Sequence, residues 1–60
     1  MTYFETMELT HYLSHRAAIA TSQVQVECLW SLIDVVEAER REIVAAERLE
    51  EARRLVASAA

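Results

Sequence analysis

Glycine, proline, asparagine and lysine are absent from this chain of 60 residues. The tight turns that join neighbouring β-strands depend on glycine and asparagine, so an all-β fold is difficult to build from this composition. Alanine, glutamate, leucine, arginine and valine are abundant instead. The composition therefore predicts an all-α protein in a single domain, residues 1–60.

Cysteine is nearly absent too, because Cys28 is the only one. A single cysteine cannot form an intrachain disulfide framework. A domain of about 60 residues buries only about 60% of the surface of its unfolded chain, and small domains are commonly stabilised by disulfides, a metal or oligomerisation. We expect a partner chain or a metal to complete the fold, and Cys28 to be a buried small hydrophobe.

Positive charge is scarce: ten acidic side chains against six arginines give a net charge of −4. An acidic chain does not attract nucleic-acid phosphates by bulk electrostatics. No apolar run approaches the roughly 18 residues of a membrane-spanning helix. The N-terminal stretch lacks the basic and apolar regions of a signal peptide. We expect a cytoplasmic protein in which Cys28 stays reduced.

What is present is helical patterning in two segments. Thr2 and Glu5 form a capping-box pattern, which predicts a first helix over residues 3–20. Residues that recur at steps of three and four predict the inner face of this helix. They are Leu9, Tyr12, Leu13, Arg16, Ala17 and Ala20.

The second segment follows a weak turn signal. Ser22, with Gln25 three residues later, predicts a turn at residues 21–22 and a second helix over residues 23–57. A competing interpretation places the turn at residues 31–34, with Ser31 or Asp34 as the helix cap. The alternation of Val24, Val26 and Cys28 is also compatible with a short strand.

The second helix carries two apolar stripes on opposite sides. One stripe lies in its first half and consists of Leu29, Leu32, Ile33, Val36 and Ile43. The other lies in its second half, is rich in alanine and has the spacing of heptad a and d positions. We call it the alanine seam, and it consists of Ala38, Ala45, Leu49, Ala52 and Val56.

The two helices differ in length. At 1.5 Å per residue, the first spans about 27 Å and the second about 52 Å, so the first covers only half of the second. We predict a helical hairpin that dimerises into a four-helix-bundle or coiled-coil-like assembly, with the alanine seam as the dimer interface.

The sequence contains no catalytic signature. Glu8, His11 and His15 have a spacing that some metal sites use, but the inward-facing carboxylates of a di-iron site are missing. We expect no catalytic residue, no metal and no cofactor.

Five arginines in the second half of the chain alternate with glutamates. Glu37 with Arg41 and Glu50 with Arg54 have the favourable spacing for ion pairs on a helix surface. We interpret the whole group as a solvated, salt-bridged face. The group consists of Arg40, Arg41, Arg48, Arg53 and Arg54.

Large side chains near the N-terminus exceed what one amphipathic face requires. Tyr3, Phe4, Met7 and Tyr12 are therefore candidate partner-binding residues. Trp30 is a candidate as well, although we expect it to be buried in the core, where tryptophan is usually found.

These observations predict a small non-enzymatic regulator or inhibitor, of the kind that phages and mobile elements encode, which acts as a homodimer and occludes a target protein. Two alternatives stay open. One is a nucleic-acid-binding regulator of transcription or RNA, and the other is a structural oligomerisation segment.

Overall fold

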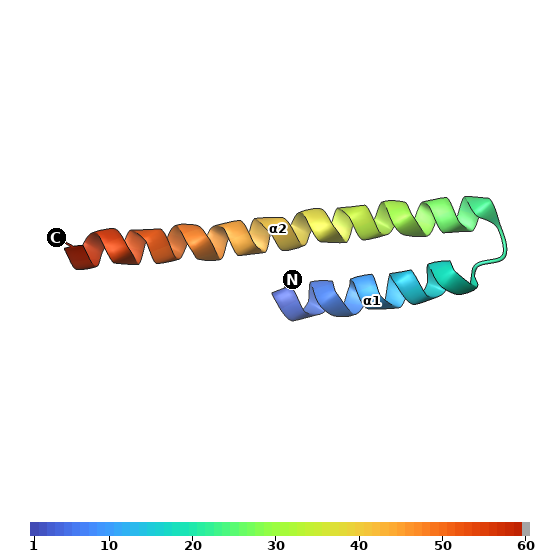
Figure 1. Cartoon of the computed structure of the whole chain (residues 1–60), viewed down its shortest axis with the longest axis horizontal. Helices are drawn as coiled ribbons and strands as arrows, with labels where there is room; N and C mark the ends of the chain where they lie inside the picture. Colours follow the sequence, from blue (N-terminus) through green and yellow to red (C-terminus); the bar gives the residue numbers. More distant parts are fainter. Residues whose placement is uncertain (60) are drawn as a thin grey trace.

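The computed structural model describes residues 1–59 and contains two helices, α1 (Tyr3–Ile19) and α2 (Gln23–Ala59). The helices run antiparallel and side by side, and the C-terminal part of α2 projects beyond the start of α1 (Figure 1). The all-α hairpin of a short and a long helix is confirmed. Residues 31–34 lie inside α2 and no strand occurs in residues 1–59, so the later turn and the short strand are both wrong.

Local hydrogen bonds fix the start of α1. The Thr2 hydroxyl accepts from the Glu5 N–H at 3.1 Å, and the Glu5 carboxylate accepts from the Thr2 N–H at 3.3 Å. This reciprocal pair satisfies two backbone donors that the first helical turn otherwise leaves unpaired. The helix therefore begins where the sequence places its cap.

The turn between the helices is built without glycine. Ala20 is extended, with φ −66° and ψ 141°, and no residue in the described part of the chain has a positive φ. The Ser22 hydroxyl then accepts from the Gln25 N–H at 3.1 Å and caps α2. Extended backbone followed by a serine cap reverses the chain with conformations open to any residue.

Small and polar side chains of α1 face α2. Thr6 and Ala17 are buried, and Thr10 and Leu13 are half-buried. The predicted inner face of α1 is therefore partly wrong, because it also contained exposed residues. These are Leu9, Tyr12 and Arg16.

The stripe of α2 that faces α1 agrees better with the prediction. Ile33 is only 2% exposed, and three other members of the predicted stripe are half-buried: Leu29, Val36 and Ile43. Leu32 is the exception, with half of its surface exposed. It lies one position before Ile33 and so points away from the line of contact.

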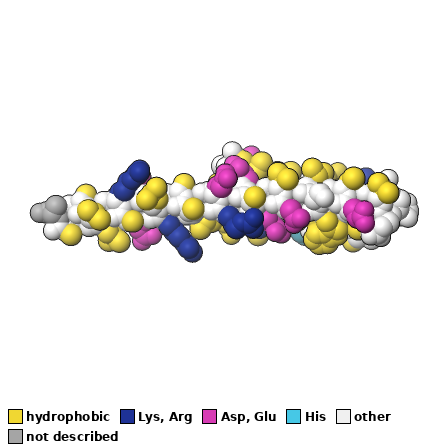
Figure 2. Space-filling model, turned by 90° about the horizontal axis from the view of Figure 1, so that it is seen from above, with side chains coloured by type: hydrophobic (Ala, Val, Ile, Leu, Met, Phe, Trp, Pro, Cys, Tyr) yellow, Lys and Arg dark blue, Asp and Glu magenta, His cyan; other side chains and the backbone are white. Residues whose placement is uncertain are grey.

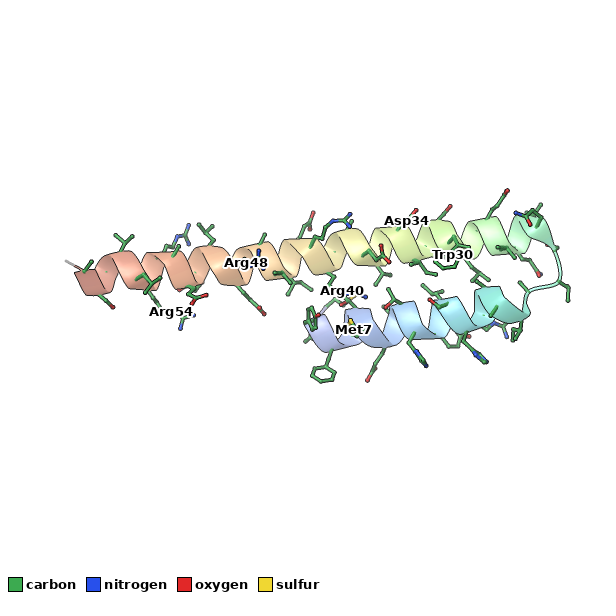
Figure 3. All side chains as sticks on the ribbon, in the orientation of Figure 1. Met7, Trp30, Asp34, Arg40, Arg48 and Arg54 are labelled. Atoms are coloured by element: carbon green, nitrogen blue, oxygen red, sulfur yellow. The ribbon has the colours of Figure 1, made fainter. Side chains whose placement is uncertain are left out.

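A polar network joins the helices beside this apolar stripe. Arg40 lies between the helices (Figure 3) and donates from Nε to the Thr6 hydroxyl at 3.1 Å. Its Nη2 donates to the Thr6 carbonyl at 3.1 Å and to the Thr10 hydroxyl at 2.7 Å. The Thr6 hydroxyl in turn donates to the Tyr3 carbonyl at 2.6 Å. Every polar group that Thr6 buries therefore has a partner.

The hairpin exposes more surface than a compact protein of its size. A folded monomer of 6.9 kDa exposes about 4,000 Å², whereas this chain exposes 4951 Å². Its dimensions are 59 × 15 × 13 Å, and every residue from 45 to 59 is exposed. One copy of the chain leaves about 1,000 Å² uncovered that a compact fold would bury.

The Arg40 network predicts a specific loss of stability. Replacing Arg40 with Met removes three donors and leaves the Thr6 hydroxyl and carbonyl short of partners, which we expect to lower the free energy of unfolding by about 1–3 kcal/mol. Arg40→Lys should recover only part of the loss, because an ammonium does not reproduce the planar fork of a guanidinium.

Urea unfolding followed by circular dichroism at one fixed protein concentration measures this effect. Arg54→Met is the matched control, because Arg54 is exposed and donates no hydrogen bond to α1, and it should change stability by less than about 0.5 kcal/mol. Equal losses from the two variants would contradict the role of Arg40.

Candidate protein-binding surfaces

Large apolar side chains lie on the outside of the hairpin. Phe4 is 79% exposed, Tyr12 59% and Trp30 51%. The cause on α1 is the contact between the helices, which uses Thr6, Thr10, Leu13 and Ala17 and leaves the aromatic residues outside it. The expected burial of Trp30 is therefore wrong for a single hairpin.

One groove between the helices contains Trp30. Met7 of α1 and Trp30 of α2 both line it, on the same side of the hairpin (Figure 3). Ile33 closes its floor, and polar side chains form its rim. We call it the Trp30 groove, and it is lined by Met7, Thr10, His11, Ser14, Trp30, Ile33 and Glu37.

A second groove continues along this side. Tyr3 is one helical turn before Met7 on α1, and Val44 is two turns after Glu37 on α2, so the two grooves follow one another along the hairpin. Arginine side chains border the apolar surface here. We call it the Tyr3 groove, and it is lined by Tyr3, Arg40, Arg41, Val44, Ala45 and Arg48.

The structure thus groups three of the five candidate partner-binding residues. Tyr3, Met7 and Trp30 share one side of the hairpin. Phe4 and Tyr12 line neither groove. The helical periodicity of α1 places Phe4 on the side that faces away from α2 and Tyr12 on the side opposite the grooves. A partner on the grooved side would contact the first three and not the last two.

Cys28 is exposed rather than buried, which corrects the expectation for this residue. It lines a third groove near the turn, together with Arg16 and Leu29. Its heptad position explains the exposure, because Cys28 comes one residue before Leu29, which faces α1. A cysteine's usual preference for burial does not say which face of a helix it occupies.

The alanine seam lies on the side of α2 that is turned away from α1. Ala38 is half-buried, and the other members are exposed, with Leu49 at 54% and Val56 at 73%. Apolar side chains follow this side of α2 along its length (Figure 2). Within residues 1–59, no other segment buries Ala45, Leu49, Ala52 or Val56.

The charged residues differ from the prediction at two places. Arg40 belongs to the contact between the helices and not to a solvated face, as its position seven residues after Ile33 would have indicated. The ion pair of Glu50 is with Arg53, at 3.9 Å, and not with Arg54. It is also the sole ion pair within residues 1–59, so the face is not the salt-bridged one that we predicted.

The described part of the structure contains no cluster of side chains suited to a metal ion. Glu8, His11 and His15 are exposed on α1, and no three metal-ligating side chains gather among residues 1–59. Neither of the two described helices has the length and hydropathy needed to cross a bilayer.

Comparison of the chain with protein-family models, with curated protein sequences and with solved structures gives no match. The function of the hairpin is therefore inferred from its own residues and their exposure.

Trp30 and Ile33 give a test of the placement of the core. Ile33→Ala should cost about 2–5 kcal/mol, as truncations of buried residues do, because Ile33 is almost fully buried. Trp30→Ala should cost less in the isolated protein, since half of its surface is exposed. Thermal unfolding of the two variants at low micromolar concentration makes the comparison. A larger loss from Trp30→Ala would place it in a buried core instead.

Proposed function

We propose that this chain is a small non-enzymatic regulator, which works in the cytoplasm as a homodimer and blocks a target protein by covering its surface. One observation carries the proposal: the hairpin leaves its aromatic side chains exposed, with Phe4, Tyr12 and Trp30 more than half exposed. Exposed apolar grooves with polar rims are typical of protein-binding sites.

The amount of exposed surface supports a contact with a second copy. The excess of about 1,000 Å² is close to the roughly 800 Å² that each partner buries in a standard protein interface. The alanine seam shares Ala45 with the Tyr3 groove but shares no residue with the Trp30 groove. A second copy on the seam therefore leaves the Trp30 groove free for a target.

The grooved side has the composition of a binding surface. Aromatic residues and arginine are the side chains that contribute most to binding energy at protein interfaces. Tyr3 and Trp30 are half-exposed here, and Arg41 and Arg48 lie next to Tyr3. In this proposal, Trp30 and Tyr3 are the anchors that contact the target.

Capture from a bacterial lysate tests the proposed surface. Immobilised protein should retain one protein in stoichiometric amount, and Trp30→Ala should reduce the retained amount at least tenfold. Phe4→Ala is the matched control, because Phe4 is more exposed than Trp30 but lies outside both grooves, and it should retain the target. Equal capture by the two variants would place the binding surface elsewhere.

Nucleic acid is the alternative ligand, and Arg41 and Arg48 in one groove are the observation that favours it. Two arginines supply few phosphate contacts, so affinity for nucleic acid should be weak even at low salt and should decrease further with added salt. Titration with mixed DNA and RNA decides between the two classes of partner. A stable oligomer that captures neither protein nor nucleic acid would be a structural oligomerisation segment.

The position of Leu49 in the alanine seam predicts that a charge at this position prevents dimerisation. Leu49→Glu places a charge in the seam, and we expect light scattering to show monomers. Leu55→Glu is the matched control, because Leu55 is similarly exposed but lies off the seam. A Leu49→Glu protein that stays dimeric would remove the seam from the interface.

A further inference from the structure

The apolar row on the outer side of α2 is longer than the alanine seam. Toward the turn, the same alternation of three and four residues continues through Val35, Cys28 and Val24. Val24 is 70% exposed and Val35 is 66% exposed. We call the part of it between residues 24 and 49 the outer row, which leaves out Ala52 and Val56 of the seam. It consists of Val24, Cys28, Ser31, Val35, Ala38, Glu42, Ala45 and Leu49.

Four charged residues follow the outer row along one side, seven residues apart. The first two are acidic, Glu27 and Asp34, and the next two are basic, Arg41 and Arg48. In the view of α2 from its outer side, arginine side chains lie mainly over the C-terminal half, and acidic side chains lie over both halves (Figure 2). Asp34 points away from α1 (Figure 3), as this placement requires. When this charge pattern is aligned with a copy running in the opposite direction, each acidic residue faces a basic one.

We propose that the outer row binds the outer row of a second copy in antiparallel orientation, with Glu27 beside the partner's Arg48 and Asp34 beside the partner's Arg41. Two-fold symmetry makes each pair twice, so four ion pairs border the contact. The inference rests on the homodimer of the proposed function, and adds its orientation and register.

This register also matches the residues within the row. Val24 lies opposite the partner's Leu49, Val35 opposite the partner's Ala38, and Cys28 opposite the partner's Ala45. Glu42, the one charged residue of the row, lies opposite the partner's Ser31, whose hydroxyl can donate to it. The alanines let the two helix backbones approach closely.

Other arrangements bring like charges together. A shift by one heptad places Arg41 beside the partner's Arg41, and a shift in the other direction places Asp34 beside the partner's Asp34. A parallel dimer in register stacks Glu42 on the partner's Glu42. The charge pattern therefore selects one register, in the way that flanking charges set partner orientation in coiled coils.

The proposed dimer is a flat layer of four helices, with the two α2 helices in the middle and an α1 on each outer side. Trp30 lies on the same side of α2 as Asp34 and Arg41. The two-fold axis passes through this side, so both Trp30 grooves open on one broad face of the dimer. A target with two binding sites gains affinity from such a face without any new contact.

The single native cysteine makes the register measurable. In Ala45→Cys, mild oxidation should join Cys28 to the new cysteine of the partner, because facing positions of a close helix pair meet the spacing of a disulfide. Peptide mass spectrometry identifies the linked residues. The unmodified chain is the control and should not cross-link, since the two Cys28 residues are about 25 Å apart in this register. In Ala52→Cys the two thiols are one heptad out of line and should cross-link far less.

The outcomes separate this inference from the proposed function. A dimer by light scattering that links Cys28 to the partner's Cys28 is parallel and overturns the register alone. A dimer whose disulfide forms faster in Ala52→Cys than in Ala45→Cys is shifted by a heptad, and this result also overturns the register alone. Monomers at all concentrations overturn both the register and the homodimer.

Charge reversal supplies an independent test. Arg48→Glu should weaken the dimer about tenfold, because it turns two attractive pairs into repulsive ones. Glu27→Arg combined with Arg48→Glu should restore most of the affinity. Loss of affinity in the double variant beyond that of the single one would contradict the pairing.

Discussion

The hydrogen bonds from Arg40 to Thr6 and Thr10 determine which side of α1 faces α2, and the exposure of the other residues of α1 depends on this choice. A guanidinium between two helices needs acceptors, and the two threonines supply hydroxyl and carbonyl oxygens within 3.1 Å. Leaving a buried polar group unpaired costs more than making its hydrogen bond gains. The network therefore mainly destabilises other orientations of α1 about its own axis, since any of them would leave Arg40 without these acceptors.

The orientation of α1 decides what the molecule shows to its surroundings. With Thr6, Thr10, Leu13 and Ala17 turned toward α2, the aromatic residues of α1 lie outside the contact. Threonine and alanine bury little apolar area, so α1 contributes limited hydrophobic stabilisation to the hairpin. The exposed aromatic surface and the proposed need for a partner have the same origin.

Much of the fold could be predicted because its signals are local. The Thr2 cap, the Ser22 cap and the apolar stripe through Ile33 each depend on residues a few positions apart. The inner face of α1 was harder, since hydrophobicity favours Leu9 and Tyr12 over Thr6. What selects Thr6 is an arginine 34 positions later, and a single-helix pattern does not contain that information. The exposure of Cys28 and Trp30 was missed for a similar reason, because residue preferences average over both faces of a helix.

The overhang of α2 explains why the proposed dimer contact lies on the side opposite α1. The heptad positions of Ile33 and Arg40 continue at Glu47 and Arg54, so the face that would prolong the α1 contact becomes charged (Figure 3). A longer α1 would therefore find no apolar surface to cover. The apolar residues of this half lie on the outer side instead, in line with Leu49. The N-terminal half of α2 presents apolar residues to α1, and its outer side presents a second apolar surface. The helix can therefore contact α1 and a second copy at the same time. In the proposed dimer, the two α2 helices lie in the middle.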